Sequence, residues 1–162
     1  LVVILVAAVL QTSATPFFPI FGIRADLVLI FLAVWANVSR GSHILLWAFS
    51  AGLVLDLASG TPSGTNTLAL TAGAYVAVFG GSEIFRTNLP GSLVAVAVST
   101  LIYYPITMLL LQSHGFAVPW GRTLSTTIPL ATMVNVLAAL VLYWPITLLE
   151  RMTRGKRPYR IL

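Results

Sequence analysis

The sequence contains no cysteine among its 162 residues, which excludes disulfide bonds and thiolate chemistry. Charged residues are also scarce, at 8%, whereas hydrophobic residues make up 58% of the chain. A soluble core of this size cannot bury so much apolar side chain, and so few charges cannot cover its surface. We therefore predict an all-α membrane protein with lipid as the solvent for most of its surface.

Nine basic residues outnumber four acidic ones, but they are not spread over a face as a phosphate-binding surface requires. No nucleic-acid partner is therefore predicted. More than half of the basic residues form a C-terminal tail: Arg151, Arg154, Lys156, Arg157 and Arg160. This tail could set the topology, attract anionic membrane lipid or bind a cytoplasmic partner, and the sequence leaves these alternatives open.

Apolar runs recur along the chain, and about 20 residues suffice to cross a bilayer, so we predict about six transmembrane helices. The predicted helices cover residues 1–15, 26–38, 43–58, 65–80, 92–112 and 125–150. Pro105 and Pro145 are expected to kink the last two, and Pro129 to lie in the first turns of the last. The helices form one domain, residues 1–150, before a short tail, residues 151–162. Because the chain opens at Leu1 inside an apolar run, we expect further residues before it.

The loops predict the orientation, because cytoplasmic loops carry an excess of lysine and arginine. With both termini in the cytoplasm, seven basic residues lie on the inner side and only Arg24 and Arg122 lie outside. The tryptophans then fall near the interfaces, with Trp35, Trp47 and Trp144 inside and Trp120 outside. The sequence therefore predicts a multi-pass membrane protein with two cytoplasmic ends.

Asp56 is the main candidate site residue, because a charge near the bilayer centre costs about 2.5 to 3.5 kcal/mol. It falls near the outer end of its predicted helix, where the helix dipole also disfavours a negative charge. We expect the N–H groups of Thr65 and Asn66, which follow a short Gly and Pro loop, to compensate the charge. Two roles stay open for Asp56, and with it for Gly64 and Asn66: holding the loop, or contacting a partner or ligand.

Two further features concern helix ends and helix packing. Asp26 stands at the start of the second predicted helix, where a carboxylate can cap free N–H groups. The fourth predicted helix carries small residues at intervals of four, which let another helix approach closely, either from this chain or from a partner. They are Ala69, Gly73, Ala77 and Gly81. Ala48 and Gly52 form a shorter pair of the same kind on the third helix.

Residue patterns typical of enzymes are missing. His43 and His114 are predicted on opposite membrane faces, so they cannot share a metal ion. A serine hydrolase built from Ser63, His114 and Asp56 would lack the G-x-S-x-G turn that presents the nucleophile. We therefore predict no catalytic activity, no metal site and no cofactor.

The segment from Ala51 to Asn66, AGLVLDLASGTPSGTN, resembles the signature of the MreD family of bacterial rod shape-determining membrane proteins. Upstream, the run ADLVL at 25–29 is similar to the P-D-L-x-L opening of that family's second helix, with Ala25 in place of the usual proline. The resemblance extends from end to end of the chain. It implies that these motif positions are structural or bind a partner: Asp26, Gly52, Asp56, Gly60, Pro62, Gly64 and Asn66.

The resemblance implies a non-enzymatic scaffold in the bacterial inner membrane that maintains rod shape within the cell-wall elongation complex. Its expected partner is MreC, with further contacts to MreB and to RodA and the elongation penicillin-binding protein, which build peptidoglycan. MreD proteins also look like distant relatives of the substrate-binding subunits of energy-coupling-factor vitamin transporters, which gives the expected fold and an alternative function. Those subunits meet their transporter through an A-x-x-x-A face, a spacing that Ala7, Ala8 and Ala14 lack.

Overall fold

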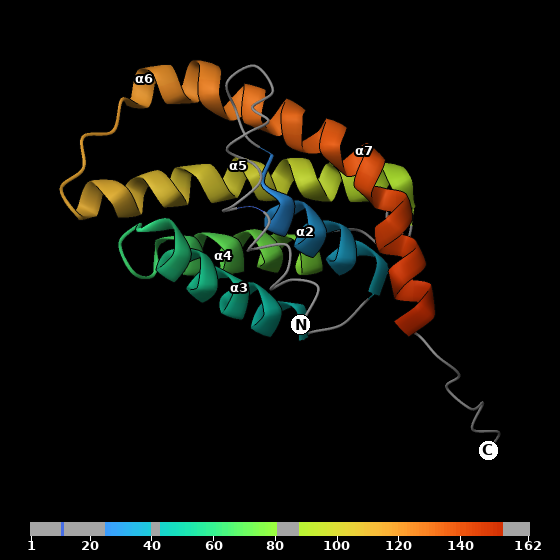
Figure 1. The fold of residues 1–162 in the computed structure, drawn as a ribbon. Helices are drawn as coiled ribbons and strands as arrows, with labels where there is room; N and C mark the ends of the chain where they lie inside the picture. The colour runs from blue at the N-terminus through green and yellow to red at the C-terminus, as the bar shows by residue number, and fades with distance from the viewer. Residues whose placement is uncertain (1–10, 12–24, 40–42, 81–87, 154–162) are drawn as a thin grey trace.

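The structure is a computed structural model that describes residues 11, 25–39, 43–80 and 88–153. In this part of the chain every regular element is a helix, as predicted (Figure 1). The elements are α2 (Leu27–Ser39), α3 (His43–Ser59), α4 (Thr65–Phe79), α5 (Leu89–Ser113), α6 (Trp120–Arg122), the π-helix η3 (Thr123–Thr127) and α7 (Ile128–Thr153). Of the predicted first helix, at 1–15, only Gln11 lies among the described residues.

Two helices are long and apolar enough to cross a membrane. They are Leu89–Ser113, with 25 residues, and Trp120–Met152, with 33 residues, in which α6, η3 and α7 follow one another. The other three are apolar but have only 13 to 17 residues, or about 20 to 25 Å of helix against about 30 Å of hydrocarbon. The structure thus supports a membrane protein, and the count of six spans stays a prediction.

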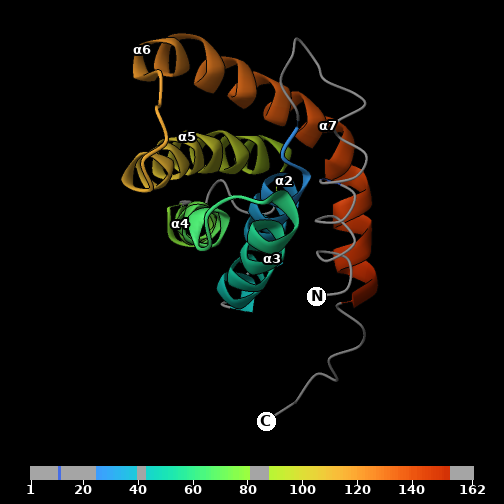
Figure 2. The same ribbon diagram turned by 60° about the vertical axis from the view of Figure 1, so that its left-hand side comes forward.

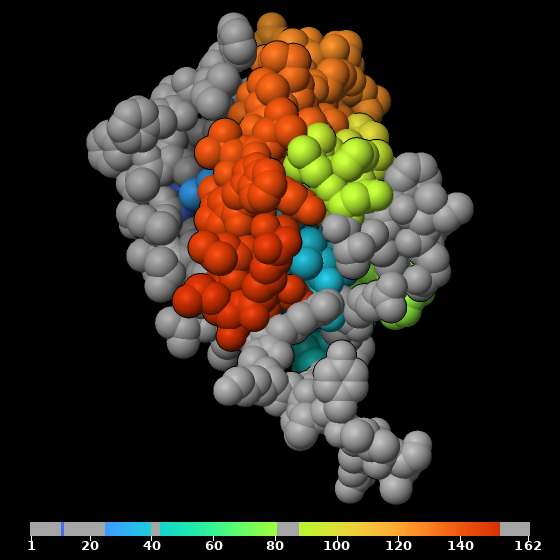
Figure 3. All heavy atoms as spheres, turned by 90° about the vertical axis from the view of Figure 1, so that its right-hand side faces the viewer, coloured from blue at the N-terminus to red at the C-terminus, as the bar shows by residue number. Residues whose placement is uncertain are grey.

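Helix α2 is the central element of the bundle. Every residue from Val28 to Val38 is buried, as expected for a helix that is apolar all round. It contacts α3 and α4 on one side and α5 and α7 on the other, and α3 has no contact with α7. Figures 1 and 2 show this arrangement, and in Figure 3 only a small part of α2 is visible beside α7. The short helix α2 therefore packs against helices on both sides, while α4 and α5 also contact each other directly.

The outer surface of the bundle is strongly apolar. Leu57 on α3 is 84% exposed and Val141 on α7 is 75% exposed. Large exposed apolar side chains also project from α4 and α5, among them Tyr75 and Leu109. A soluble monomer rarely exposes so much contiguous apolar surface, whereas lipid accommodates it. This surface agrees with the apolar composition from which membrane insertion was predicted.

Both long helices begin earlier than the sequence predicted. Helix α5 starts at Leu89 because the Asn88 side chain accepts a hydrogen bond from the Gly91 N–H at 2.9 Å. The helical run that ends the bundle starts at Trp120, but Pro129 is the second residue of α7, so it lies in the first turn of that helix, as predicted. In a regular helix the proline ring would clash with the carbonyl one turn earlier, and the wider π-helical turn η3 stands at that place.

The two prolines predicted to kink their helices behave differently. In Figure 1, α7 changes direction in its C-terminal half, where Pro145 lies. A proline inside a helix removes one backbone hydrogen bond and allows such a bend. Helix α5 contains Pro105 but shows no sharp bend in Figures 1 and 2, so the expected kink there is not seen.

Glycines allow α4 to pack closely against its neighbours on both sides. A Cβ atom added at Gly52 on α3 would lie 2.8 Å from the backbone nitrogen of Thr67 and closer still to its Cα. At Gly73, on the other side of α4, an added Cβ would lie 3.3 Å from the carbonyl oxygen of Ser99 on α5. The Ser99 hydroxyl donates a hydrogen bond to the Gly73 carbonyl at 2.9 Å. The contact at Gly52 places the end of α3 directly against the start of α4.

Substituting Gly52 by alanine tests this close approach. Because the added methyl group would meet backbone atoms, which cannot rotate away, α3 and α4 must separate, and we expect a loss of about 1 to 3 kcal/mol in stability. The measurement is denaturant unfolding of the detergent-solubilised protein. Gly121→Ala is the matched control, since nothing lies within 4 Å of a Cβ there. Equal stability of the two variants would contradict the packing.

Candidate functional site

The candidate site is the corner where α3 ends and α4 begins, which comprises Asp56, loop residues 59–64, Asn66 and Thr67. Asp56 lies in the last turn of α3 with only 6% of its surface exposed. Gly60 and Gly64 have positive φ angles of 66° and 93°, so they take up a conformation that other residues rarely adopt. This reversal of the chain turns the start of α4 back toward Asp56.

The carboxylate of Asp56 is fully engaged by the start of α4. One oxygen accepts from the N–H of Asn66 at 2.7 Å, and the other accepts from Gly64 at 2.9 Å and Thr67 at 3.2 Å. The Thr67 hydroxyl adds a bond of 2.6 Å. These donors are groups that the first turn of a helix leaves unpaired, and the positive end of the helix dipole adds to the attraction.

The expected compensation of Asp56 was therefore correct for Asn66 and wrong for Thr65. The N–H of Thr65 instead closes a turn with the carbonyl of Pro62 at 3.2 Å. A capping carboxylate reaches the second and third residues of a helix more readily than the first, because their N–H groups point toward the capping position. The predicted motif residue Pro62 thus holds the loop through its carbonyl group.

The side chain of Asn66 connects the loop to α5. Its nitrogen donates to the Thr61 hydroxyl at 2.8 Å and more weakly to Ser59 at 3.4 Å. Its oxygen accepts from the hydroxyl of Tyr103 on α5 at 2.7 Å. Asn66 is 7% exposed, so both ends of its amide are paired within a nearly dry environment.

A second polar cluster lies between α2, α5 and α7. One oxygen of the Asp26 carboxylate accepts from the Tyr104 hydroxyl at 2.9 Å and from the Asn135 amide at 3.1 Å. Asn135 is fully buried, and it also donates to the Thr100 hydroxyl at 3.2 Å while its oxygen accepts the Asp26 N–H at 2.9 Å. Tyr104 lies inside α5 and Asn135 lies inside α7, so these hydrogen bonds hold Asp26 between the two long helices.

The predicted capping of α2 by Asp26 is therefore corrected. Within the described residues, the Asp26 carboxylate binds other helices, and the Val28 N–H at the start of α2 donates to the Gln11 side chain at 2.9 Å. Gln11 thus takes the capping role. An aspartate just before a helix was a sound capping signal, but a glutamine distant in sequence gives none.

The small residues of α4 pack within the chain. Ala69, Gly73 and Ala77 are buried, and Gly73 lies against Ser99 of α5, as described above. On α3, Ala48 and Gly52 are also buried. Of the two readings left open by the sequence, this placement favours packing inside the chain over contact with a partner. Gly81 lies outside the described residues.

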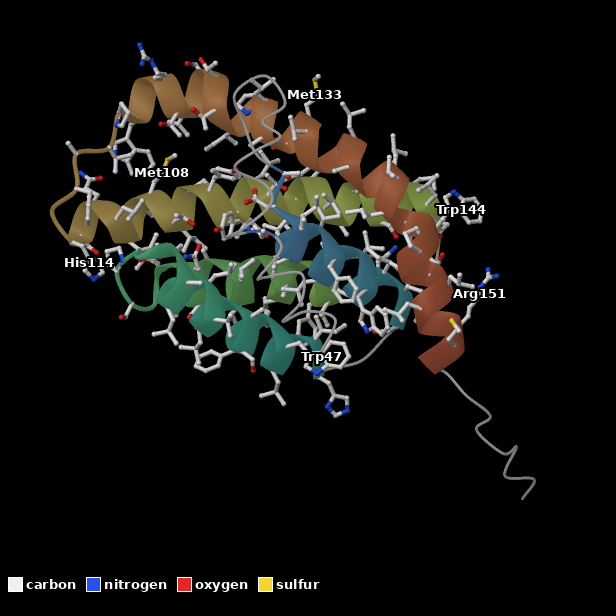
Figure 4. All side chains as sticks on the ribbon, in the orientation of Figure 1. Trp47, Met108, His114, Met133, Trp144 and Arg151 are labelled. Atoms are coloured by element: carbon white, nitrogen blue, oxygen red, sulfur yellow. The ribbon has the colours of Figure 1, made fainter. Side chains whose placement is uncertain are left out.

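The basic tail is described only at its first residue. Arg151 is exposed in the last turn of α7, and Figure 4 places it with Trp144 at the end of the bundle opposite His114. His114 lies at the same end as the loop between α3 and α4 (Figure 4). The remaining tail residues lie outside the described residues: Arg154, Lys156, Arg157 and Arg160.

The residues considered for a hydrolase do not form a triad. The donors of α4 occupy the Asp56 carboxylate, and the Nδ1 atom of His114 lies 2.7 Å from the Leu110 carbonyl. Ser63 is exposed on the loop. Among the described residues there is also no group of three or more histidine, aspartate or glutamate side chains that could hold a metal ion.

Several residues of the two clusters were missed from the sequence. Tyr103, Tyr104, Thr100 and Asn135 lie inside long apolar helices, where tyrosine and threonine are ordinary residues. Asn135 gave the one usable signal, because an amide in the middle of a membrane helix requires a hydrogen-bonding partner. The sequence cannot tell which helix supplies that partner.

An all-helical bundle with two membrane-length helices, an apolar exterior and carboxylates used to hold helices together defines a structural membrane protein. Residues 1–153 match the family model described as rod shape-determining protein MreD, and the chain belongs to that family. The resemblance predicted from the corner sequence is thereby confirmed, and with it a role in determining rod shape. No match was found among curated proteins or solved structures, so the likeness to vitamin-transporter subunits stays a prediction.

Replacing Asp56 by asparagine tests whether its carboxylate holds the corner. An asparagine would turn an NH2 group toward backbone donors and leave buried N–H groups unpaired. We therefore expect the free energy of unfolding to fall by about 3 kcal/mol. Denaturant unfolding in detergent measures it. Ser63→Ala changes an exposed side chain of the same loop and should leave stability unchanged. An Asp56→Asn variant as stable as the parent would rule out this role.

Proposed function

We propose that this MreD protein is a non-enzymatic, multi-pass scaffold of the bacterial inner membrane that binds MreC through the corner between α3 and α4. Through MreC it connects to the peptidoglycan synthase machinery, with RodA, the elongation penicillin-binding protein and MreB as further contacts. Membership of a rod shape-determining family supports the biological setting. MreC is the partner that the resemblance of the sequence to this family implies.

The observation that carries the proposal is how the Asp56 carboxylate is used. All of its described hydrogen bonds go to the loop and to α4, so the charge serves to fix a backbone conformation. Meanwhile Ser59, Gly60 and Ser63 of the same loop are exposed. A rigid, exposed loop loses little conformational entropy when a partner binds, which favours recognition.

The chemistry of the loop supports a protein partner. Residues 59–64 carry no charge, so they offer hydroxyl and backbone groups and the proline ring for contact. The charge distribution of the sequence predicts that this loop lies on the outer side, with both termini in the cytoplasm. A partner that meets it there must itself have an extracytoplasmic part, which is a property expected of MreC.

Crosslinking from single cysteines tests the proposed contact, and the chain has no native cysteine to interfere. We expect Ser63→Cys to crosslink to MreC in membranes, because Ser63 is exposed on the loop. Met152→Cys is the matched control: it is 74% exposed, but near the end of α7, close to Arg151 at the opposite end of the bundle.

The pattern of crosslinks decides the outcome. A crosslink from Ser63→Cys alone supports docking at the corner. A crosslink from Met152→Cys alone would move MreC to the other end of the bundle, and the corner would lose its proposed role. A crosslink from neither position, with both variants folded, would contradict MreC as the partner at these surfaces.

A further inference from the structure

Two consecutive tyrosines on α5 bind the starts of two different helices. The Tyr103 hydroxyl donates to Asn66 at the start of α4, whereas the Tyr104 hydroxyl donates to Asp26, just before α2. Successive residues of a helix point about 100° apart, so neighbouring side chains can reach different helices. The two rings meet edge to face with centroids 5.5 Å apart. Each tyrosine thus supports one of the two polar clusters.

Tyr103 supplies the donor that pairs the oxygen of the Asn66 amide. With the Asn66 oxygen turned to Tyr103, the nitrogen must face the loop, where Thr61 and Ser59 accept its hydrogen atoms. Tyr103 is 7% exposed, so few water molecules can replace its hydroxyl group. The Ser59 and Thr61 hydroxyls donate to the Leu55 carbonyl and to Asp56, so both are left to accept from the Asn66 nitrogen, and the Tyr103 donor completes this arrangement at the amide oxygen.

The loop therefore has two attachments to the bundle. The first is the Asp56 carboxylate, which joins α3 to the loop and to the start of α4. The second runs from Thr61 through Asn66 to Tyr103, and among the hydrogen bonds of the described residues it alone connects the loop to α5. The Thr61 hydroxyl links the two, since it also approaches the Asp56 carboxylate at 3.4 Å.

We propose that Tyr103 is a positioning residue for the docking corner, and that its hydroxyl, acting through Asn66, sets the place of loop 59–64 relative to α5. This inference rests on the proposed function, because it concerns the surface assigned there to partner binding. Tyr103 itself is buried and does not touch the partner. Its effect on docking passes entirely through the loop.

Hydrogen exchange of single amides tests the positioning in the full protein. In Tyr103→Phe we expect the amides of Gly64, Asn66 and Thr67, which donate to Asp56, to exchange about three- to tenfold faster, the effect of one lost hydrogen bond. The Gly80 amide at the far end of α4 should keep its rate. The same experiment on Tyr104→Phe is the matched control, since that hydroxyl binds Asp26.

Recovery of MreC with the tagged protein tests the consequence for docking. We expect Tyr103→Phe and Asn66→Ala to reduce the recovery of MreC about threefold or more. Tyr104→Phe should recover as much MreC as the parent protein, although its thermal stability should be similar to that of Tyr103→Phe. A double variant of Tyr103 and Asn66 should be no weaker than Asn66→Ala alone, because both act through one contact. Thr61→Val, which breaks the same path at the surface, provides a second test should Tyr103→Phe fail to fold.

The outcomes separate this inference from the proposed function. The positioning role would be overturned if the exchange rates of the corner amides were unchanged in Tyr103→Phe. It would also be overturned if Tyr104→Phe changed these rates equally. If Asn66→Ala weakens MreC recovery and Tyr103→Phe does not, the positioning role for docking is also wrong. Faster corner exchange with full MreC recovery in every variant would instead contradict docking at the corner, and Tyr103 would position a loop with another use.

Discussion

The fold depends on one interaction, in which the carboxylate at the end of α3 accepts the backbone N–H groups at the start of α4. Asp56 would be costly in a membrane helix if it were unpaired, and the first turn of α4 would leave donors unpaired. Bringing the two together removes both costs. The contact requires a close approach of the helices, which Gly52 permits, and a tight reversal of the chain, which Gly60 and Gly64 permit.

The same principle is repeated at the centre of the bundle, where Asp26 is held between Tyr104 and Asn135. Each interhelical hydrogen bond in a membrane protein contributes only about 0.6 kcal/mol on average, so neither cluster explains stability by itself. Their value is geometric, because apolar helices in lipid have many similar ways to pack. A few polar contacts select one register. The consecutive tyrosines Tyr103 and Tyr104 hydrogen-bond the starts of α4 and α2, so both helices are positioned against α5.

The sequence predicted what local chemistry determines. The helical class followed from the apolar runs, and the pairing of Asp56 with Asn66 followed from the short Gly and Pro loop. The family followed from the resemblance of residues 51–66 to its signature. The early start of the last helix was missed because Gly121 and Arg122 are typical of loops. The partners of Asp26 could not be predicted, since Asn135 is 109 residues away and only the packing of α2 against α7 brings them together.

The central claim is that the Asp56 carboxylate accepts backbone N–H groups of α4. A through-hydrogen-bond scalar coupling between the amide nitrogen of Asn66 and the side-chain carboxyl carbon of Asp56, measured by NMR on isotope-labelled protein, tests it most directly. We expect a resolved coupling, because the two groups are 2.7 Å apart in an almost dry environment. No coupling, together with an Asn66 amide that exchanges with water as freely as one in an unstructured chain, would contradict it.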